Sequence, residues 1–182
     1  MKKFFPVFLT ILVFSGFLVG QVFFDLLDLP ARPSKTERKL NAHYEGLFYK
    51  LKMVDTKKKD FDLKALKQKV VILNFWASWC IPCLDEMPSL VKVQKKYGEK
   101  LLILGINTDE ENQNKAIKKI VKKYKLNFPV IPDSKNKILD QFLISGLPYS
   151  IIFVDGKVHQ VSQGSKDFFS GEMVEFYDKT IL

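Results

Sequence analysis

The chain has 182 residues, 47% of them hydrophobic, and its formal net charge at pH 7 is +9. This length is sufficient for one hydrophobic core, and no internal repeat indicates a second domain. The basic residues are dispersed along the chain instead of forming one patch, so we expect a solvated surface and no nucleic-acid binding.

The N-terminus begins with the basic head Met1-Lys2-Lys3, which precedes an uncharged apolar run from Phe4 to Phe24. As a helix rising about 1.5 Å per residue, this run can cross a hydrocarbon core of roughly 30 Å. It is longer than the apolar region of a cleavable signal peptide and has no A-x-A site, so residues 1–24 are predicted to be an uncleaved membrane anchor. The alternative is a removed signal peptide and a soluble periplasmic protein. The leading lysines favour a cytoplasmic N-terminus, which places the following domain in the periplasm or its equivalent.

Residues 25–42 combine prolines and mixed charges without sustained periodicity, which predicts a tether between the membrane and a domain over residues 43–182. The loose alternation from Leu47 to Val54 predicts an edge strand. A short helical turn is expected from Phe61 to Leu66.

The apolar run from Val70 to Phe75 predicts a strand that is buried on both faces of a mostly parallel sheet. After it, the periodicity alternates between helix and strand, and a hairpin with an Asp-Gly turn comes near the end. This order predicts an α/β fold whose central sheet is mixed and mostly parallel, with helices on both faces. The predicted helices are 112–124, 137–144 and 165–179, and the further strands are 101–107, 128–131, 151–154 and 158–161.

The only two cysteines of the chain lie in the sequence Trp79-Cys80-Ile81-Pro82-Cys83, directly after the buried strand. If a helix starts near Cys80, the two cysteines share one face at roughly 5–6 Å. That spacing lies within the range of about 4.4–6.8 Å between Cα atoms that a disulfide requires. Pro82 suits the first turn, and the free N–H groups there favour a thiolate at Cys80. We therefore predict a redox-active pair in which Cys80 attacks a partner disulfide and Cys83 resolves the mixed disulfide.

Two other interpretations of the cysteine pair are weaker. A structural zinc site usually needs four ligands, and only His43 and His159 remain, at unhelpful distances along the chain. No metal site is expected. A static disulfide closing so short a loop constrains the unfolded chain little, so it would stabilise the fold poorly.

The run from Asn74 to Cys83, followed by Glu86 and Pro88, resembles the membrane-anchored, extracytoplasmic thioredoxin-like proteins of the TlpA/ResA type. A second match is Gly146-Leu147-Pro148, which is followed by a strand and the turn Asp155-Gly156-Lys157. The resemblance implies a thioredoxin-like fold, thiol-disulfide oxidoreductase activity without a cofactor, and a cis proline at 148 that faces the cysteine pair. Position 147 departs from the pattern, because these families often carry a β-branched residue there.

Glu86 is the candidate for proton exchange with Cys83, which lies three residues before it. On a helix from Cys80, Glu86 falls at the edge of the apolar stripe, where burial would raise its pKa. An ordinary solvated glutamate is an equal alternative from geometry alone, and the match to the family's glutamate position favours the functional interpretation. Asn74 stands where thioredoxin carries a buried Asp, so a proton-handling group must come from elsewhere.

The resemblance also implies the substrates, which are disulfides and thiols of partner proteins. Reduction is the implied direction, with apocytochrome c or an oxidised copper-site protein as substrate and a membrane thiol reductase as a further partner. Trp79, Leu147 and Pro148 are the expected substrate-binding residues, and the backbone of Leu147 could pair with an extended partner strand. The alternatives are oxidation of thiols in folding proteins, peroxide reduction and a non-catalytic binding module. A peroxiredoxin-type Pro-Thr-Cys site is absent, and a binding module has no need for an intact cysteine pair.

Overall fold

The computed structural model describes residues 13–21 and 33–181. The chain divides into two compact units, residues 1–37 and 38–182, and each is described by itself. In the first unit, residues 13–21 are helical, and large apolar side chains such as Phe14 and Phe17 are exposed. The remainder of the predicted anchor, residues 4–12 and 22–24, lies outside the described residues. Within the described ranges, no helix is both long enough and apolar enough to cross a membrane.

Helix α2 (Lys35–Phe48) occupies a stretch for which the sequence predicts a tether as far as residue 42 and then a strand from Leu47. Ser34 and Glu37 form a capping box at its start, in which each backbone N–H donates to the side chain of the other residue. Tyr44 and Phe48 are buried and pack in a cluster with side chains that lie about a hundred residues further along the chain. The prediction was wrong here, because the apolar face of this helix is narrow and is stabilised by these distant contacts.

A small antiparallel sheet follows, formed by β1 (Lys52–Val54) and β2 (Asp60–Asp62). The Asp55 carboxylate holds the connecting turn, since one of its oxygens accepts from the backbone N–H groups of Lys57 and Lys59. Strand β1 begins at Lys52, so the edge strand is shorter than the predicted span from Leu47 to Val54. The expected helical turn is confined to a 3-10 helix, η1 (Leu63–Ala65), and Phe61 belongs to β2.

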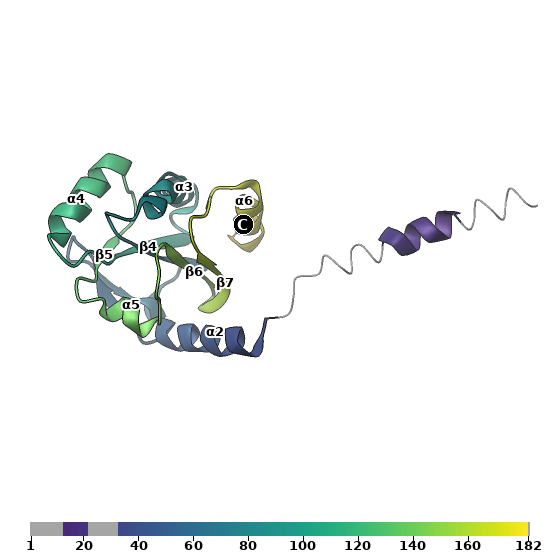
Figure 1. The fold of residues 1–182 in the computed structure, drawn as a ribbon, viewed down its shortest axis with the longest axis horizontal. Coiled ribbons are helices and arrows are strands. Elements are labelled where there is room, and N and C mark those ends of the chain that lie inside the picture. Colours follow the sequence, from purple (N-terminus) through teal and green to yellow (C-terminus); the bar gives the residue numbers. More distant parts are fainter. Residues whose placement is uncertain (1–12, 22–32, 182) are drawn as a thin grey trace, which may run out of the picture. The chain divides into compact units, whose positions relative to one another are not determined.

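The central sheet has five strands in the order β5-β4-β3-β6-β7 (Figure 1). Their bounds are Val70–Trp76 for β3, Leu101–Asn107 for β4, Val130–Pro132 for β5, Tyr149–Val154 for β6 and Lys157–Gln163 for β7. Strands β3, β4 and β5 pair in parallel, whereas β6 runs antiparallel to both β3 and β7. The predicted mixed sheet is confirmed, but parallel pairing dominates only one half of it.

Four helices follow β3 in chain order, and they cover both faces of the sheet. They are α3 (Ile81–Tyr97), α4 (Gln113–Tyr124), α5 (Lys137–Gln141) and α6 (Gly171–Ile181). Helices α3, α4 and α6 contribute to one hydrophobic cluster, and α2 and α5 to the other. Figure 1 shows α3 and α6 on one side of the strands and α2 and α5 on the opposite side. The predicted element order is confirmed, although α6 begins six residues later than predicted.

Every residue of β3 is buried, which confirms a strand covered on both faces. Because side chains alternate along a strand, Ile72 and Trp76 belong to the cluster of α3, and Leu73 and Phe75 to the cluster of α2. Asn74 falls on the same face as Ile72 and Trp76. A polar side chain thus points from the middle of the sheet toward α3.

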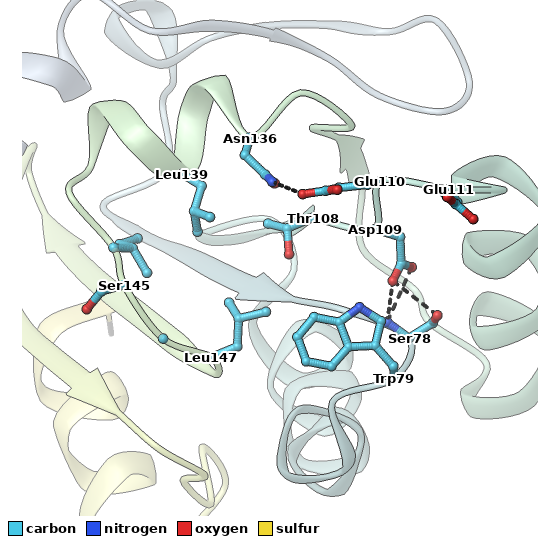
Figure 2. A pocket seen from close by; sticks show the side chains of 12 residues that line it. Ser78, Trp79, Thr108, Asp109, Glu110, Glu111, Asn136, Leu139, Ser145 and Leu147 are labelled. Atoms are coloured by element: carbon cyan, nitrogen blue, oxygen red, sulfur yellow. Dashed lines mark hydrogen bonds between the residues drawn. The ribbon is translucent and has the colours of Figure 1, made fainter.

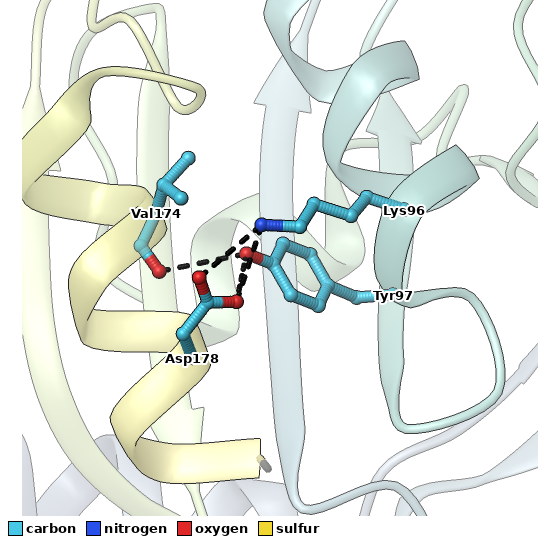
Figure 3. Close-up of polar contacts among 4 residues, drawn as sticks. All are labelled: Lys96, Tyr97, Val174 and Asp178. Atoms are coloured by element: carbon cyan, nitrogen blue, oxygen red, sulfur yellow. Dashed lines mark hydrogen bonds and ion pairs between the residues drawn. The ribbon is translucent and has the colours of Figure 1, made fainter.

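Polar contacts connect the C-terminal end of α3 to α6 (Figure 3). The Tyr97 hydroxyl donates to a carboxylate oxygen of Asp178 at 2.6 Å, and Lys96 Nζ lies 3.2 Å from the same carboxylate. The aromatic ring of Tyr97 also packs against Tyr177. These contacts hold the end of α3 that is remote from the cysteine pair.

Candidate active site

The cysteine pair lies at the point where β3 leads into α3. Cys80 is the N-cap residue of the helix, and its Sγ accepts from the backbone N–H of Cys83 at 3.3 Å. The two cysteines form a disulfide with a Cα–Cα distance of 5.3 Å, within the range predicted from their spacing. Pro82 stands in the first helical turn, where its missing N–H is tolerated. The N–H directed at Cys80 Sγ would stabilise a thiolate there once the disulfide is reduced.

The two cysteines differ in access to solvent. Cys80 is 5% exposed, whereas Cys83 is fully buried. The neighbours of Cys80, Trp79 and Ile81, are each 71% exposed. Large apolar side chains at the surface on both sides of a reactive sulfur are typical of a protein-docking site. Cys80 is therefore the more accessible of the two sulfurs, although both are largely buried.

Glu86 lies one helical turn beyond Cys83 and is only 2% exposed. One carboxylate oxygen accepts from Asn74 Nδ2 at 2.6 Å, and the other accepts from the backbone N–H of Lys166 at 3.3 Å. Both donors are neutral, and none of the ion pairs among the described residues includes Glu86. Burial therefore outweighs the two hydrogen bonds and raises the pKa of Glu86 to about 7. The burial and the raised pKa that the sequence analysis expected for a functional Glu86 are both present.

Asn74 and Ser150 complete this buried polar cluster, and neither residue was predicted from the sequence to have a role. Asn74 Nδ2 also donates to Ser150 Oγ at 2.9 Å, and the two residues are direct partners in the register of β3 and β6. The Oδ1 atom of Asn74 is buried and has no hydrogen-bond partner among the described residues. A single polar residue within an otherwise apolar strand was a signal for Asn74. Ser150 could be found only from the strand register.

The Leu147–Pro148 peptide bond is cis, as the resemblance implied, and Pro148 is buried. Leu147 is partly buried and packs against the hydrophobic cluster that contains both cysteines. Neither the N–H nor the C=O of Leu147 makes a hydrogen bond within the described part of the chain. These two groups remain available to a partner backbone.

A cavity of about 620 Å³ is lined by Trp79, which directly precedes Cys80, and by Leu147 (Figure 2). The loop after β4 forms another part of its wall. In this loop Asp109 accepts from the backbone N–H of Ser78 at 3.0 Å and from the Ser78 hydroxyl at 3.1 Å. Asp109 thus connects the loop after β4 to the residue that precedes Trp79. This contact spans 31 positions of the chain, and it was not predicted from the sequence.

Comparison with known proteins finds relatives of this chain. The pattern of the AhpC/TSA family matches residues 47–161. The thiol-disulfide oxidoreductase ResA of Bacillus cereus is 43% identical over 108 residues, which cover 58% of this chain and 61% of the relative. The ResA of Bacillus thuringiensis subsp. konkukian is 39% identical over 131 residues, which cover 71% of this chain and 73% of the relative.

The solved structures show the same fold. The crystal structure of StoA from Bacillus subtilis matches with a TM-score of 0.58 and 23% identity, over 70% of this chain and 95% of that one. A secreted Mycobacterium tuberculosis disulfide oxidoreductase, described as homologous to E. coli DsbE, matches with a TM-score of 0.60 and 22% identity, over 73% of this chain and 96% of that one. The chain therefore belongs to the AhpC/TSA family and, within it, to the thioredoxin-like thiol-disulfide oxidoreductases that include the ResA proteins.

Proposed function

We propose that this protein reduces disulfides of partner proteins outside the cytoplasm. The observation that carries the proposal is the Cys80–Cys83 pair at the start of α3, with the buried Glu86 one turn beyond it. Reduction of a partner disulfide needs an accessible thiolate, a second thiol within bonding distance and a group that can accept a proton near neutral pH. These residues supply all three.

The reaction is two successive thiol–disulfide exchanges. The Cys80 thiolate attacks one sulfur of the partner disulfide, a bond forms between them, and the other partner sulfur leaves as a thiolate. Cys83 then attacks Cys80 Sγ, which re-forms the Cys80–Cys83 bond and releases the second partner thiol. The partner disulfide gains two electrons and the protein dithiol loses two. A membrane thiol reductase is the proposed donor that returns the pair to the dithiol.

Glu86 acts in the second exchange. Cys83 is fully buried and must lose its proton before it can attack. The Glu86 carboxylate accepts that proton, because its pKa of about 7 lies between that of an ordinary carboxyl and that of an ordinary thiol. Asn74 and Ser150 hold the carboxyl in place without adding a positive charge that would lower its pKa.

Partner proteins dock as an extended segment along Leu147. The free N–H and C=O of this residue would pair with the partner backbone by β-strand addition. Trp79, which directly precedes Cys80, offers an exposed indole to the partner, and Pro148, which follows Leu147, is buried. Apocytochrome c and an oxidised copper-site protein are the candidate substrates.

We further propose that the apolar run from Phe4 to Phe24 anchors the protein in the membrane and that the domain faces the periplasm or its equivalent. The support is the uncharged sequence itself and the exposed apolar side chains of residues 13–19. Cell fractionation should recover the full-length protein with the membranes. A soluble form beginning near Gln21 would instead indicate a cleaved signal peptide.

Trapping of the mixed disulfide tests the reaction and identifies the partners. Replacing Cys83 by Ser removes the resolving thiol, so the variant should accumulate covalent adducts that a reducing agent releases. Cys80→Ser is the matched control and should accumulate almost none, since the remaining thiol of Cys83 is fully buried, whereas Cys80 keeps a small exposed fraction of 5%. Equal trapping by both variants would refute the assigned roles, and trapping by neither would favour a non-catalytic binding module.

The reduction potential tests the direction of the reaction. If the protein is a reductant, the Cys80–Cys83 pair, equilibrated against glutathione, should have a reduction potential near that of thioredoxin, about −270 mV. If it oxidises folding proteins, the potential of the pair should instead be about −120 mV, the value of a strong oxidant. The second value would overturn the proposed direction and leave the exchange chemistry in place.

A further inference from the structure

The docking loop, residues 143–148, leads from the end of α5 to β6 and carries Leu147. Its middle residues, Ser145, Gly146 and Leu147, make no backbone hydrogen bond within the described part of the chain. At its start, Leu143 has a φ of 54°, which is costly for a bulky side chain unless neighbouring contacts hold it. The position of Leu147 therefore depends on the contacts that hold the two ends of the loop.

One side chain of helix α2 contacts both ends. The ring of Tyr44 packs against Phe142, the residue directly before the loop, with the ring centroids 5.5 Å apart. The hydroxyl of Tyr44 shares a hydrogen bond of 2.9 Å with the hydroxyl of Tyr149, the residue directly after the loop. Tyr44 is 1% exposed and Phe142 is fully buried. A single buried aromatic side chain thus connects the start of the docking loop to its end.

The residues on either side of Tyr44 contact the same region. Nε2 of His43 forms a hydrogen bond of 2.7 Å with the backbone C=O of Gln141, the last residue of α5. Glu45 accepts from the backbone N–H of Val158 at 3.1 Å, and Val158 belongs to β7, the strand that pairs with β6. Figure 1 shows α2 beside α5 on one side of the sheet. Three consecutive residues of α2 therefore hold the elements that the docking loop joins.

The docking loop connects these contacts to the cysteine pair. Leu147 packs against the hydrophobic cluster that contains Tyr44 and against the cluster that contains both cysteines. It also lines a cavity together with Trp79, the residue before Cys80. A hydrogen bond between two backbones weakens steeply when its distance or angle departs from the optimum. A partner segment can therefore pair with Leu147 and present a sulfur to Cys80 only if the loop is held in one position.

We propose that Tyr44 is a positioning residue for the docking of partner proteins. Its ring and hydroxyl hold the two ends of the docking loop, so that the N–H and C=O of Leu147 stay where a partner strand pairs with them. Tyr44 belongs to the cluster of α2, whereas both cysteines belong to the cluster of α3, so Tyr44 acts on binding and leaves the exchange chemistry to the cysteines. This inference rests on the proposed function and names a residue that supports its docking step.

The test compares two disulfides that react with the reduced full-length protein. One is a peptide with a single internal disulfide, and its backbone can pair with Leu147. The other is dithiobis-nitrobenzoate, a small aromatic disulfide that has no peptide backbone and releases a coloured thiolate. Rapid mixing with each disulfide in excess gives the second-order rate constant of the first exchange. A series of peptide concentrations also gives the half-saturating concentration.

Tyr44→Phe keeps the ring and removes the hydroxyl, so the hydrogen bond to Tyr149 is lost. The rate constant for the peptide should fall about fivefold, through a higher half-saturating concentration, because docking is impaired. The rate constant for the small disulfide should change much less. Tyr149→Phe removes the same hydrogen bond and should have the same effect. The double variant should be no slower than either single variant, since only one interaction is lost.

Tyr97→Phe is the matched control, because it removes the hydrogen bond of another tyrosine, to Asp178, and should leave both rate constants unchanged. An unchanged peptide rate in Tyr44→Phe and Tyr149→Phe would overturn the inference and leave the proposed function standing. An equal loss with both disulfides would also overturn it, since the substitution would then act on the whole fold or on the cysteine pair. Failure of the unaltered protein to reduce the peptide would refute the proposed function itself.

Discussion

A carboxylate lies at each end of helix α3, and the environments of these two carboxylates are opposite. Near the N-terminal end, Glu86 is buried, its hydrogen-bond donors are neutral, and its pKa is raised to about 7. At the C-terminal end, Asp178 of α6 is partly exposed at the surface. Its pKa is lowered by the hydrogen bond from Tyr97 and, to a smaller extent, by Lys96 (Figure 3).

This difference shows what makes a carboxylate suitable for proton exchange. Asp178 receives a strong hydrogen bond and a cation, which keep it ionised and give it a structural role. Glu86 receives two neutral donors that only partly compensate for burial, so that its protonated and ionised forms have similar free energies near neutral pH. The capacity to exchange protons near neutral pH therefore depends on the exclusion of solvent from the carboxyl group and on the lack of a cation beside it. The residue type alone does not determine it.

The largest expected effect is on the resolving exchange. Glu86→Gln keeps the shape of the side chain but cannot accept the proton of Cys83, so release of the mixed disulfide should slow about 100-fold. The first attack by Cys80 should change much less. In the unaltered protein the release rate should rise with pH through about 7, because the ionised carboxylate is the active form. Rapid mixing with a disulfide peptide resolves the two steps. Asp178→Asn is the control at the other end of the fold, and an unchanged release rate in Glu86→Gln would remove Glu86 from the mechanism.

A smaller effect is expected on stability. The pKa of Glu86 rises from 4.5 to about 7 on folding, so the native protein binds the proton more tightly than the unfolded chain does. This contribution to stability is fully present below pH 4.5 and is lost as the pH rises through 7, which amounts to about 3 kcal/mol. Denaturant unfolding of the oxidised protein at pH 5 and pH 8 measures it. Glu86→Gln should lose most of this pH dependence, and an equal dependence in both proteins would contradict the assignment.

The smallest effect is expected from a change at the C-terminal end of α3, where Tyr97 contacts Asp178. Tyr97→Phe removes the hydrogen bond to Asp178 and keeps the packing of the ring against Tyr177, so the free energy of unfolding should fall by about 1 kcal/mol or less. The rates of both exchange steps should remain those of the unaltered protein, because the site at the start of α3 does not involve Tyr97. A slower release step in Tyr97→Phe would show that the two ends of α3 are coupled.

Much of the site follows from local sequence. The Cys-x-x-Cys spacing, the proline in the first turn and the apolar run before them determine a helix start next to a buried strand, and their effects act over three or four residues. The order of strands and helices after Val70 and the Asp155-Gly156 turn were predictable for the same reason, since periodicity and turn chemistry are local properties. The position of Glu86 on the inner edge of α3 also follows from helical spacing.

Other features depend on contacts that only the tertiary structure makes. Helix α2 is stabilised by packing on residues about a hundred positions away, so its sequence alone resembled a tether. The bond from Asn74 to Ser150 joins residues 76 positions apart, and only the register of β3 and β6 brings them together. The cavity lined by Trp79 likewise combines the loop after β3, the loop after β4, α5 and the loop before β6. Helical spacing is encoded within a few residues, whereas strand register and the walls of a cavity depend on the packing of the whole sheet.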